Sequence, residues 1–200
     1  MDGWSALVLA GGAGRRFASD GGGIKLLADL GGAPVIRRVV ERVCLARFAD
    51  AVVVTGAGDA GVRSALAGQP CRIVHARDWA QGMAATLRVG IDALAPGTRG
   101  ACVFLGDMPL VPVDLVSRLA EAAESAGYAA RPRCEGRPGH PVAFTRAAFA
   151  DLLALEGDRG ATALLAQRGD VAYLDTADRG VLLDIDTAED LAAAVAAWKA

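Results

Sequence analysis

The chain has 200 residues, of which 53% are hydrophobic and 22% charged, and its formal net charge is −2. This composition supports one domain with a large core and excludes a disordered chain. The small negative charge excludes a general attraction to nucleic acid, so an anionic ligand has to be held by local clusters of cations. The four cysteines are spread singly without a C-x-x-C pair, which argues against zinc and redox sites.

The sequence carries no sign of export or membrane insertion. No basic segment followed by a long apolar stretch stands at the N-terminus, and no apolar span reaches 18 residues. We therefore expect a cytoplasmic protein with neither a membrane partner nor a nucleic-acid partner.

Apolar runs alternate with helical patterns along the chain. Strands are expected at 6–10, 26–30, 51–55, 71–75 and 101–105, as short pieces within 128–144, and at 171–174 and 181–185. Helices are expected at 34–47, 59–67, 84–94, 113–125, 147–155, 161–167 and 187–198. This alternation predicts an α/β fold, a Rossmann-like three-layer sandwich whose mostly parallel sheet has helices on both faces. In such sheets ligands bind beyond the carboxyl ends of the strands.

The first expected strand, 6–10, opens at once into a glycine-rich loop with Gly11, Gly12 and Gly14. Without side chains, backbone N–H groups of such a loop can surround phosphate oxygens. The loop is not a P-loop, because no Gly-Lys-Ser/Thr follows the glycines. It is also a poor dinucleotide fingerprint, because Phe17 stands where a third glycine or alanine belongs.

Two cations follow the glycines. Arg16 lies directly after them, and Lys25 comes after a second glycine cluster at 21–23. Such side chains neutralise phosphate charge, so the stretch as a whole predicts an anion site. A plain flexible turn between a strand and a helix is the other interpretation.

Carboxylates supply the second part of the chemistry. Asp107 directly follows the strand expected at 101–105, where it could hold Mg²⁺ together with phosphates and water; a turn-forming aspartate is the alternative. Asp184 and Asp186 lie on one side of an extended segment, and one of them could complete the metal site. Asp186 and Glu189 also resemble a helix capping box, a role that a metal ligand can combine with.

Gly82 leads the helix expected from residue 84, and Met83, Thr86 and Arg88 follow it. The free N–H groups of this helix start could contact a ribose, a base or a phosphate. A plain helix N-terminus explains the same pattern.

A Gly- and Pro-rich stretch, 131–141, combines three arginines with His140. It predicts a site for a second anionic group, on an acceptor molecule, and the turn at 157–160 with Asp158 could line the same pocket. Solvated surface arginines and a structural histidine are the other interpretation. The three arginines are Arg131, Arg133 and Arg137.

A phosphate cradle, two cations, one or two metal-binding acids and a separate basic loop fit nucleotidyl transfer. In this reaction an acceptor phosphate attacks the α-phosphorus of a nucleoside triphosphate, and pyrophosphate leaves. The nucleophile is already ionised, so catalysis is positioning and charge neutralisation by Mg²⁺, Lys25 and Arg16.

The sequence resembles the MobA-like nucleotidyltransferases, and within them the molybdenum cofactor cytidylyltransferases and accessory proteins of xanthine dehydrogenase type enzymes. The resemblance covers nearly the whole chain. Its broader motifs are Leu9-Ala-Gly-Gly-x-Gly-x-Arg16 with Lys25, Gly106-Asp-Met-Pro109 and Asp184-Ile-Asp-Thr-x-Glu-Asp190. Its narrower motifs are Gly82-Met-Ala-Ala-Thr-Leu-Arg88, Gly139-His-Pro-Val142 and Gly157-Asp-Arg-Gly-Ala161.

The resemblance implies a fold of the nucleotide-diphospho-sugar transferase type, Mg²⁺, and transfer of CMP from CTP to the molybdopterin cofactor. It implies one domain over 1–200, with nucleotide bound in the N-terminal half and acceptor at roughly 128–180. A molybdenum hydroxylase such as a xanthine dehydrogenase type enzyme would be the partner that receives the product. The catalytic residues would be Arg16, Lys25 and Asp107, and the metal ligands Asp107 and Asp186. Nucleotide would contact Leu9, Ala10, Gly11, Gly12, Gly14, Lys25, Thr55, Gly82, Met83 and Thr86. Acceptor would contact Arg137, His140 and Asp158.

The chain departs from the cytidylyl pattern at one position. Cytidylyl members usually have Leu-Ala-Ala-Gly, whereas this chain has glycine at position 11, as in the guanylyl branch. The alternatives are therefore a guanylyltransferase of the same cofactor, another nucleotidyltransferase with a phosphate acceptor, and a non-catalytic protein that delivers the cofactor.

Overall fold

The computed structural model describes residues 1–19, 23–157 and 160–199. Within these ranges no helix is long and apolar enough to cross a membrane. The strands are β1 Trp4–Ala10, β2 Asp50–Thr55, β3 Arg72–His75, β4 Gly100–Leu105, β5 Ala129–Cys134, β6 Arg137–Pro138, β7 Val142–Thr145 and β8 Val171–Asp175. The α-helices are α1 Arg15–Ser19, α2 Val35–Leu45, α3 Asp59–Ala65, α4 Met83–Asp92, α5 Leu115–Ala126, α6 Phe149–Leu153, α7 Thr162–Ala166 and α8 Ala188–Lys199. Short 3₁₀ helices occupy Lys25–Leu27, Trp79–Gln81, Arg146–Ala148 and Arg179–Val181.

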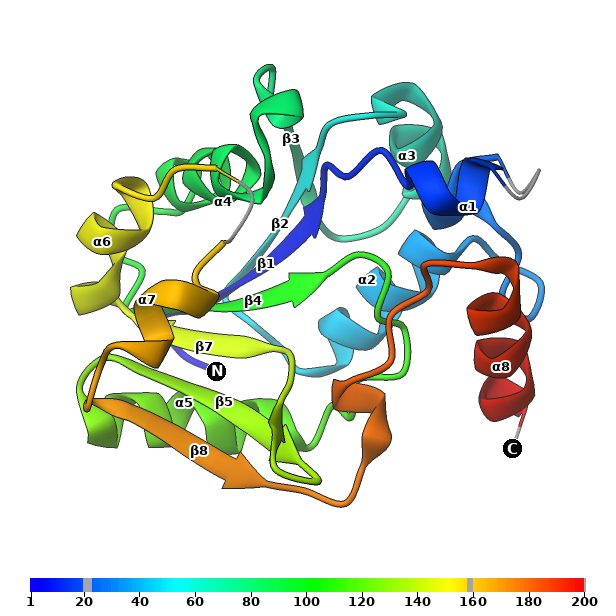
Figure 1. Cartoon of the computed structure of the whole chain (residues 1–200). Helices are drawn as coiled ribbons and strands as arrows, with labels where there is room; N and C mark the ends of the chain where they lie inside the picture. The colour runs from blue at the N-terminus through cyan, green and yellow to red at the C-terminus, as the bar shows by residue number, and fades with distance from the viewer. Residues whose placement is uncertain (20–22, 158–159, 200) are drawn as a thin grey trace.

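The strands of the described chain form one sheet in the order β3-β2-β1-β4-β7-β5-β6, with β8 paired to β5 (Figure 1). The first four are parallel to one another, and β8 is parallel to β5. Strand β7 is antiparallel to both β4 and β5. The predicted α/β fold with a mostly parallel sheet is confirmed. The carboxyl ends of β1, β2 and β4 therefore meet at one edge.

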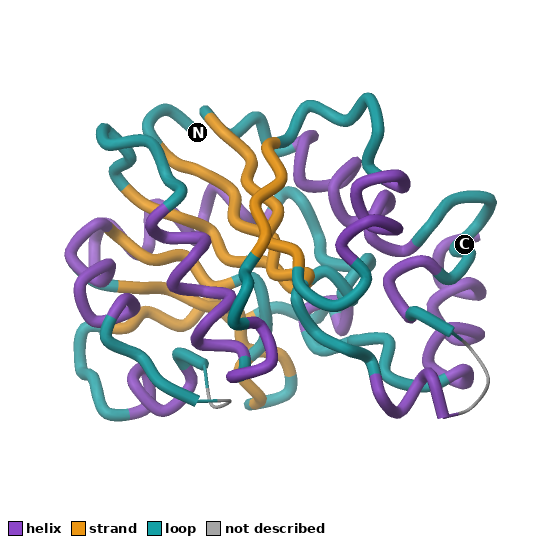
Figure 2. The backbone as a smooth tube through the Cα atoms, turned by 90° about the horizontal axis from the view of Figure 1, so that it is seen from above, coloured by secondary structure: helices purple, strands orange, loops and turns teal. Residues whose placement is uncertain are grey.

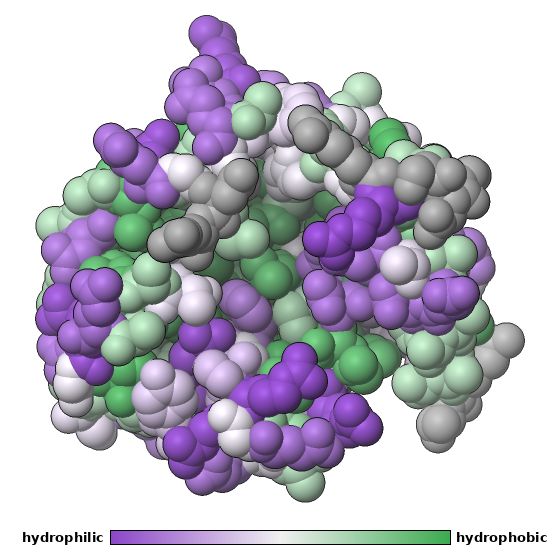
Figure 3. Space-filling view, viewed as in Figure 1, coloured by the Kyte–Doolittle hydropathy of each residue, from purple (hydrophilic) through white to green (hydrophobic). Residues whose placement is uncertain are grey.

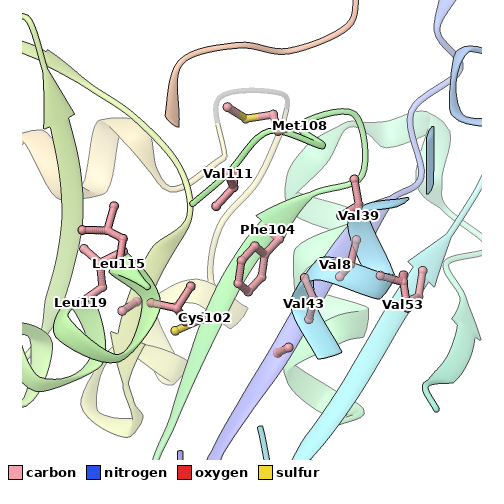
Figure 4. Packing of buried hydrophobic residues seen from close by; sticks show 14 of the residues in the cluster. Val8, Val39, Val43, Val53, Cys102, Phe104, Met108, Val111, Leu115 and Leu119 are labelled. Atoms are coloured by element: carbon pink, nitrogen blue, oxygen red, sulfur yellow. The ribbon is translucent and has the colours of Figure 1, made fainter. Parts of the chain in front are cut away.

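Each face of the sheet is covered by its own helices, as the view from above shows (Figure 2). Helices α2 and α5 pack on one face, where Phe104 of β4 lies between the valines of α2 and the leucines of α5 (Figure 4). Helices α4, α6 and α7 cover the other face through Leu87, Leu152 and Leu165. The strand β1 is buried along its whole length because both faces are covered.

Helix α8 packs away from the sheet, against the segment that follows the glycine loop (Figure 1). Its Trp198 lies under the guanidinium groups of Arg38 and Arg42 of α2, at 5.3 and 5.7 Å from the ring centroid. This packing anchors the C-terminal helix beside α1, whose Phe17 is buried in the same cluster.

Two expected strands are wrong. At 26–30 the chain forms the 3₁₀ helix Lys25–Leu27 and then a turn in which Leu30 N–H donates to the carbonyl of Ala33. At 181–185 the end of a 3₁₀ helix is followed by irregular chain. The backbone there bonds loops on two sides, because His140 N–H donates to Val181 and Ile185 N–H donates to Asp107. Apolar residues were buried in both segments, but without a neighbouring strand to form a ladder.

The start of the last helix is also built differently from the expectation. The capping box is Thr187 with Asp190, one residue later than the predicted pair Asp186 and Glu189. Asp190 N–H donates to the Thr187 hydroxyl at 3.1 Å, and the Asp190 carboxylate accepts from Thr187 N–H at 2.8 Å. The carboxylate of Asp186 is thereby left for other partners.

Candidate functional site

A cavity of about 580 Å³ lies where β1 and β4 end. In Figure 3 the molecule is hollowed near the middle of the face seen in Figure 1, with hydrophobic residues inside and hydrophilic residues around the rim. Segments far apart in the sequence supply its walls, as expected for the carboxyl edge of a parallel sheet. The lining residues are Leu9, Ala10, Gly11, Gly12, Ala13, Gly14, Lys25, Leu26, Trp79, Ala80, Gly82, Met83, Thr86, Leu105, Asp107, Asp184 and Asp186.

The glycine loop fits its surroundings only without side chains. A Cβ on Gly11 would lie 2.6 Å from the hydroxyl oxygen of Thr86, and one on Gly14 would lie 3.1 Å from Cγ of Lys25. Gly14 also has a φ of +55°, which disfavours other residues. The carbonyl of Gly11 accepts from Ala57 N–H, which ties the loop to the end of β2.

The charged centre of the cavity is Lys25. Its Nζ donates to Asp107 at 2.6 Å and to Asp186 at 2.7 Å, and Asp186 also accepts from Nη1 of Arg16 at 2.7 Å. The Lys25 side chain is only 11% exposed, whereas that of Arg16 is 79% exposed. The fold thus gathers two predicted cations and two predicted acids from three distant parts of the sequence.

Burial and the neighbouring carboxylates shift the pKa values of Lys25 and Asp184. Burial on its own would lower the pKa of Lys25, but the adjacent Asp107 and Asp186 outweigh it, and the pKa is raised. The pKa of Asp184, which also lines the cavity, is raised by burial and further by the charges of Asp107 and Asp186. Lys25 therefore carries its positive charge at neutral pH and holds the carboxylates together.

The donor set can accept a divalent cation. Oδ1 of Asp107 is buried and has no hydrogen-bond partner among the described residues. Such an oxygen, with Asp186 near it, suits a hard cation that takes its remaining ligands from phosphates and water. In the same described ranges no group of three or more His, Cys, Asp or Glu side chains could hold a metal ion by itself. The residues thus fit a metal that arrives together with a triphosphate.

The opposite wall is the start of α4. Gly82 has a φ of +110°, a conformation that lets the chain turn into the helix, and Thr86 is buried directly behind Gly11. Met83 is 42% exposed at this wall, and Ala84 N–H donates to the carbonyl of Gly157. The loop around 157 therefore borders the same opening.

Most of the predicted nucleotide contacts lie in the cavity wall, but Thr55 does not. Its side chain is fully buried, and its hydroxyl donates to Asp59 and to the carbonyl of Val74. Conversely, sequence reasoning did not include Trp79, Ala80 and Leu105 in the site. The only signal for the first two was the irregular loop before Gly82.

Two of the predicted acceptor residues, Arg137 and His140, do not line this cavity. Arg137 is exposed on β6. The His140 ring is partly buried, and its Nδ1 has no partner among the described side chains and backbone. Burial, and after it the charge of Arg131, lowers the pKa of His140 to about 4, so the ring is neutral at physiological pH. Asp158 lies outside the described residues.

Known proteins match the chain along most of its length. A model of the MobA-like NTP transferase domain matches residues 6–172. Nicotine blue oxidoreductase of Paenarthrobacter nicotinovorans is 32% identical over 198 residues, 94% of each chain. Molybdenum cofactor guanylyltransferase of Rhodobacter capsulatus is 32% identical over 194 residues, 95% of this chain and 94% of that protein.

Solved structures share the fold over nearly their whole length. Rv0371c from Mycobacterium tuberculosis H37Rv is 26% identical, with a TM-score of 0.83 over 96% of this chain and 97% of that one. Its complex with manganese superimposes with a TM-score of 0.82 at 26% identity, covering 96% and 98%. A nucleotidyl transfer enzyme from Methanothermobacter thermautotroptrophicus shares the fold, with a TM-score of 0.87 at 24% identity over 100% and 99%.

Proposed function

Because the chain belongs to the MobA-like NTP transferase family, we propose that it transfers a nucleoside monophosphate from a nucleoside triphosphate to the phosphate of the molybdopterin cofactor. The observation that carries the proposal is the convergence of Lys25, Asp107 and Asp186 beside the glycine loop in one cavity. Cations, acids and exposed backbone N–H groups are together what a triphosphate and its metal require.

In this reaction the basic and the acidic residues of the site would have different roles. The loop at 11–14 binds the triphosphate through its backbone, and Lys25 and Arg16 neutralise the charge that develops on the leaving pyrophosphate. Asp107 and Asp186 would hold Mg²⁺, which supplies charge stabilisation at the phosphates when it is bound. No general base is needed, since the acceptor phosphate is already ionised.

For the donor, we propose CTP, on the motifs at 82–88, 139–142 and 157–161 that the chain shares with the cytidylyl branch. GTP is the second candidate. It is supported by Gly11, where the contact with Thr86 disfavours the alanine of the cytidylyl pattern, and by the Rhodobacter capsulatus relative that is named a guanylyltransferase.

We propose the acceptor region at roughly 128–180, with Arg137, His140 and Asp158 facing the cofactor. A molybdenum hydroxylase is the proposed recipient of the product. The acceptor region is supported by the position of His140 at the carboxyl edge of the sheet, where β7 begins beside the end of β4.

The decisive experiment measures pyrophosphate release with molybdopterin cofactor, Mg²⁺ and each of CTP, GTP, ATP and UTP in turn. We expect release with CTP, and release with GTP alone would move the chain to the guanylyl branch. No release with any nucleotide would refute the transfer reaction. Asp107→Asn should abolish release, whereas Asp59→Asn, a change outside the cavity, should not.

The oxidoreductase relative adds a control to the same experiment. Oxidation of NADH or NADPH should be followed with a quinoid dye as acceptor. We expect none, because the glycine loop lacks the dinucleotide pattern at Phe17 and the carboxyl end of β2 offers no acid for a ribose. Dye-dependent oxidation that survives Asp107→Asn would favour a reductase instead.

A further inference from the structure

One buried charge is left unused by the reaction proposed above. Arg131 of β5 is 5% exposed, and its Nε and Nη2 donate to the carbonyl of Gly139 at 3.3 and 3.1 Å. In the described part of the chain no carboxylate forms an ion pair with it. Buried charges are ordinarily paired, since removing them from water is costly. A buried guanidinium group without a carboxylate partner can therefore bind an anionic ligand.

The strand register places Arg131 two strands away from β4, whose last residue lines the cavity. Val142 of β7 lies opposite Val103 of β4, and Ala143 lies opposite Ala130, so the next position along β5 sets Arg131 opposite Val142. Opposed residues share a face of the sheet, here the face that α4, α6 and α7 cover. Leu105, two residues beyond Val103, lies on that face and lines the cavity. Two strand spacings, about 10 Å, separate β5 from β4.

A second polar group lies at the same place. The chain passes from Gly139, which accepts from Arg131, directly to His140, whose buried Nδ1 has no partner in the described structure. A hydrogen phosphate ion carries acceptor oxygens for a guanidinium and an O–H for an imidazole nitrogen, so one oxyanion can satisfy both groups.

The neighbouring arginines do not share this situation. Arg133 donates to Asp175 at 2.7 and 3.0 Å and lies over the ring of Tyr173, and Arg137 is exposed. Of the three arginines in this stretch, only Arg131 is buried without an acid among the described residues.

We propose that Arg131 and His140 form a second anion subsite, which binds an oxyanion group of the acceptor remote from the phosphate that reacts. The proposal rests on the proposed function for the identity of the acceptor, but the binding itself does not. The group is a phosphate or a molybdate-like oxyanion. The acceptor is then bound at two points, and its reacting phosphate is directed toward Asp107.

The test is a titration of the full-length protein with orthophosphate, followed through the backbone amide signals of residues 139 and 140 by NMR. These signals separate this subsite from the glycine loop, whose own amides report phosphate bound there. Arg131→Met should weaken the phosphate response at 139–140 by about tenfold or more. Arg133→Met is the matched control, and its response should stay within about twofold of the wild type.

An unchanged response in Arg131→Met, or a wild-type response confined to the glycine loop, would overturn the proposal. If Arg131→Met does not fold, Arg131→Lys serves instead, because it keeps the charge but loses the planar fork and should bind several times more weakly. A repeat with molybdate identifies the group, since the tighter ligand of the two is the one the subsite selects.

A kinetic arm separates this proposal from the proposed function. Arg131→Met should raise KM for the acceptor while KM for the nucleotide stays unchanged, which a general structural defect would not do. Absence of pyrophosphate release in the wild type refutes the transfer reaction and leaves phosphate binding at 139–140 to be judged by itself. Turnover without that binding refutes the subsite alone.

Discussion

Lys25→Met removes the positive charge at the centre of the site and keeps the length of the side chain. Asp107, 2.6 Å from Nζ, then loses its ion-pair partner, and Asp186, 2.7 Å from Nζ, keeps its pair with Arg16. The side chains of Lys25, Asp107 and Asp186 are 11%, 19% and 33% exposed, so the interaction lies between a surface pair and a buried one. Exposed pairs contribute about 0–1 kcal/mol, and breaking buried pairs costs about 3–5 kcal/mol. We expect a loss of about 3 kcal/mol in the free energy of unfolding at pH 7.

The loss should depend on pH in a defined direction. In the wild type, Asp107 and Asp186 raise the pKa of Lys25 above its ordinary value. The stability that this charge contributes is therefore fully present below the ordinary lysine pKa and is lost as pH rises through the raised pKa. The difference in free energy of unfolding between the wild type and Lys25→Met should accordingly be full at neutral pH and shrink in strongly alkaline solution.

A divalent cation should partly replace the lost charge. Mn²⁺ or Mg²⁺ at millimolar concentration should stabilise Lys25→Met more than the wild type, because Nζ no longer competes for the two carboxylates. Urea unfolding, followed by circular dichroism with and without the ion, measures both effects. Arg63→Met, which breaks a pair with Asp59 on the surface of α3, is the control and should cost under about 1 kcal/mol. The reasoning is refuted if Lys25→Met is as stable as this control, or if neither ion raises the free energy of unfolding of Lys25→Met more than that of the wild type.

Three further predictions test other contacts. Gly11→Ala should cost about 1–3 kcal/mol because its Cβ meets Thr86, and adding Thr86→Ala should recover part of that loss; purely additive unfolding energies would contradict the contact. The NMR titration of His140 should have a midpoint near pH 4. Because this folded pKa lies below the unfolded value of about 6.5, the free energy of unfolding should fall by up to about 3 kcal/mol between pH 6.5 and 4. A midpoint near 6.5 would instead show a solvated ring. Thr187→Ala should cost about 1 kcal/mol by thermal unfolding, because the capping hydroxyl bonded to Asp190 is lost. An unchanged Tm would show that this cap does not stabilise the helix.

The sequence was sufficient for the four parallel strands β1 to β4 and for the edge at which the site lies. Buried parallel strands read as continuous apolar runs, and polar residues directly after them must meet at the carboxyl edge. That logic places Gly11 and Asp107 together without any knowledge of register. It fails for Thr55, which ends a strand at the same edge but has its hydroxyl occupied by Asp59.

Contacts that depend on distant loops could not be predicted. Composition does not indicate that the backbone of the apolar run from 181 bonds the loops around His140 and Asp107 instead of a strand. It also does not indicate that Arg131, unlike Arg133 and Arg137, is buried without an acid among the described residues. Both facts depend on contacts between segments far apart in the sequence, which no local period encodes.

The segment from Arg179 to Asp186 restricts insertions and deletions in this part of the chain. Connections between elements usually accept insertions and deletions, because few contacts fix their length. Here Gly180 lies directly against the carbonyl of Leu110, where a Cβ would overlap with it, and six residues later Asp186 contacts Lys25. A change of one residue in between would pull the acid off its partner. In homologues and in engineered variants, the length of this stretch should therefore be fixed even where its side chains are not.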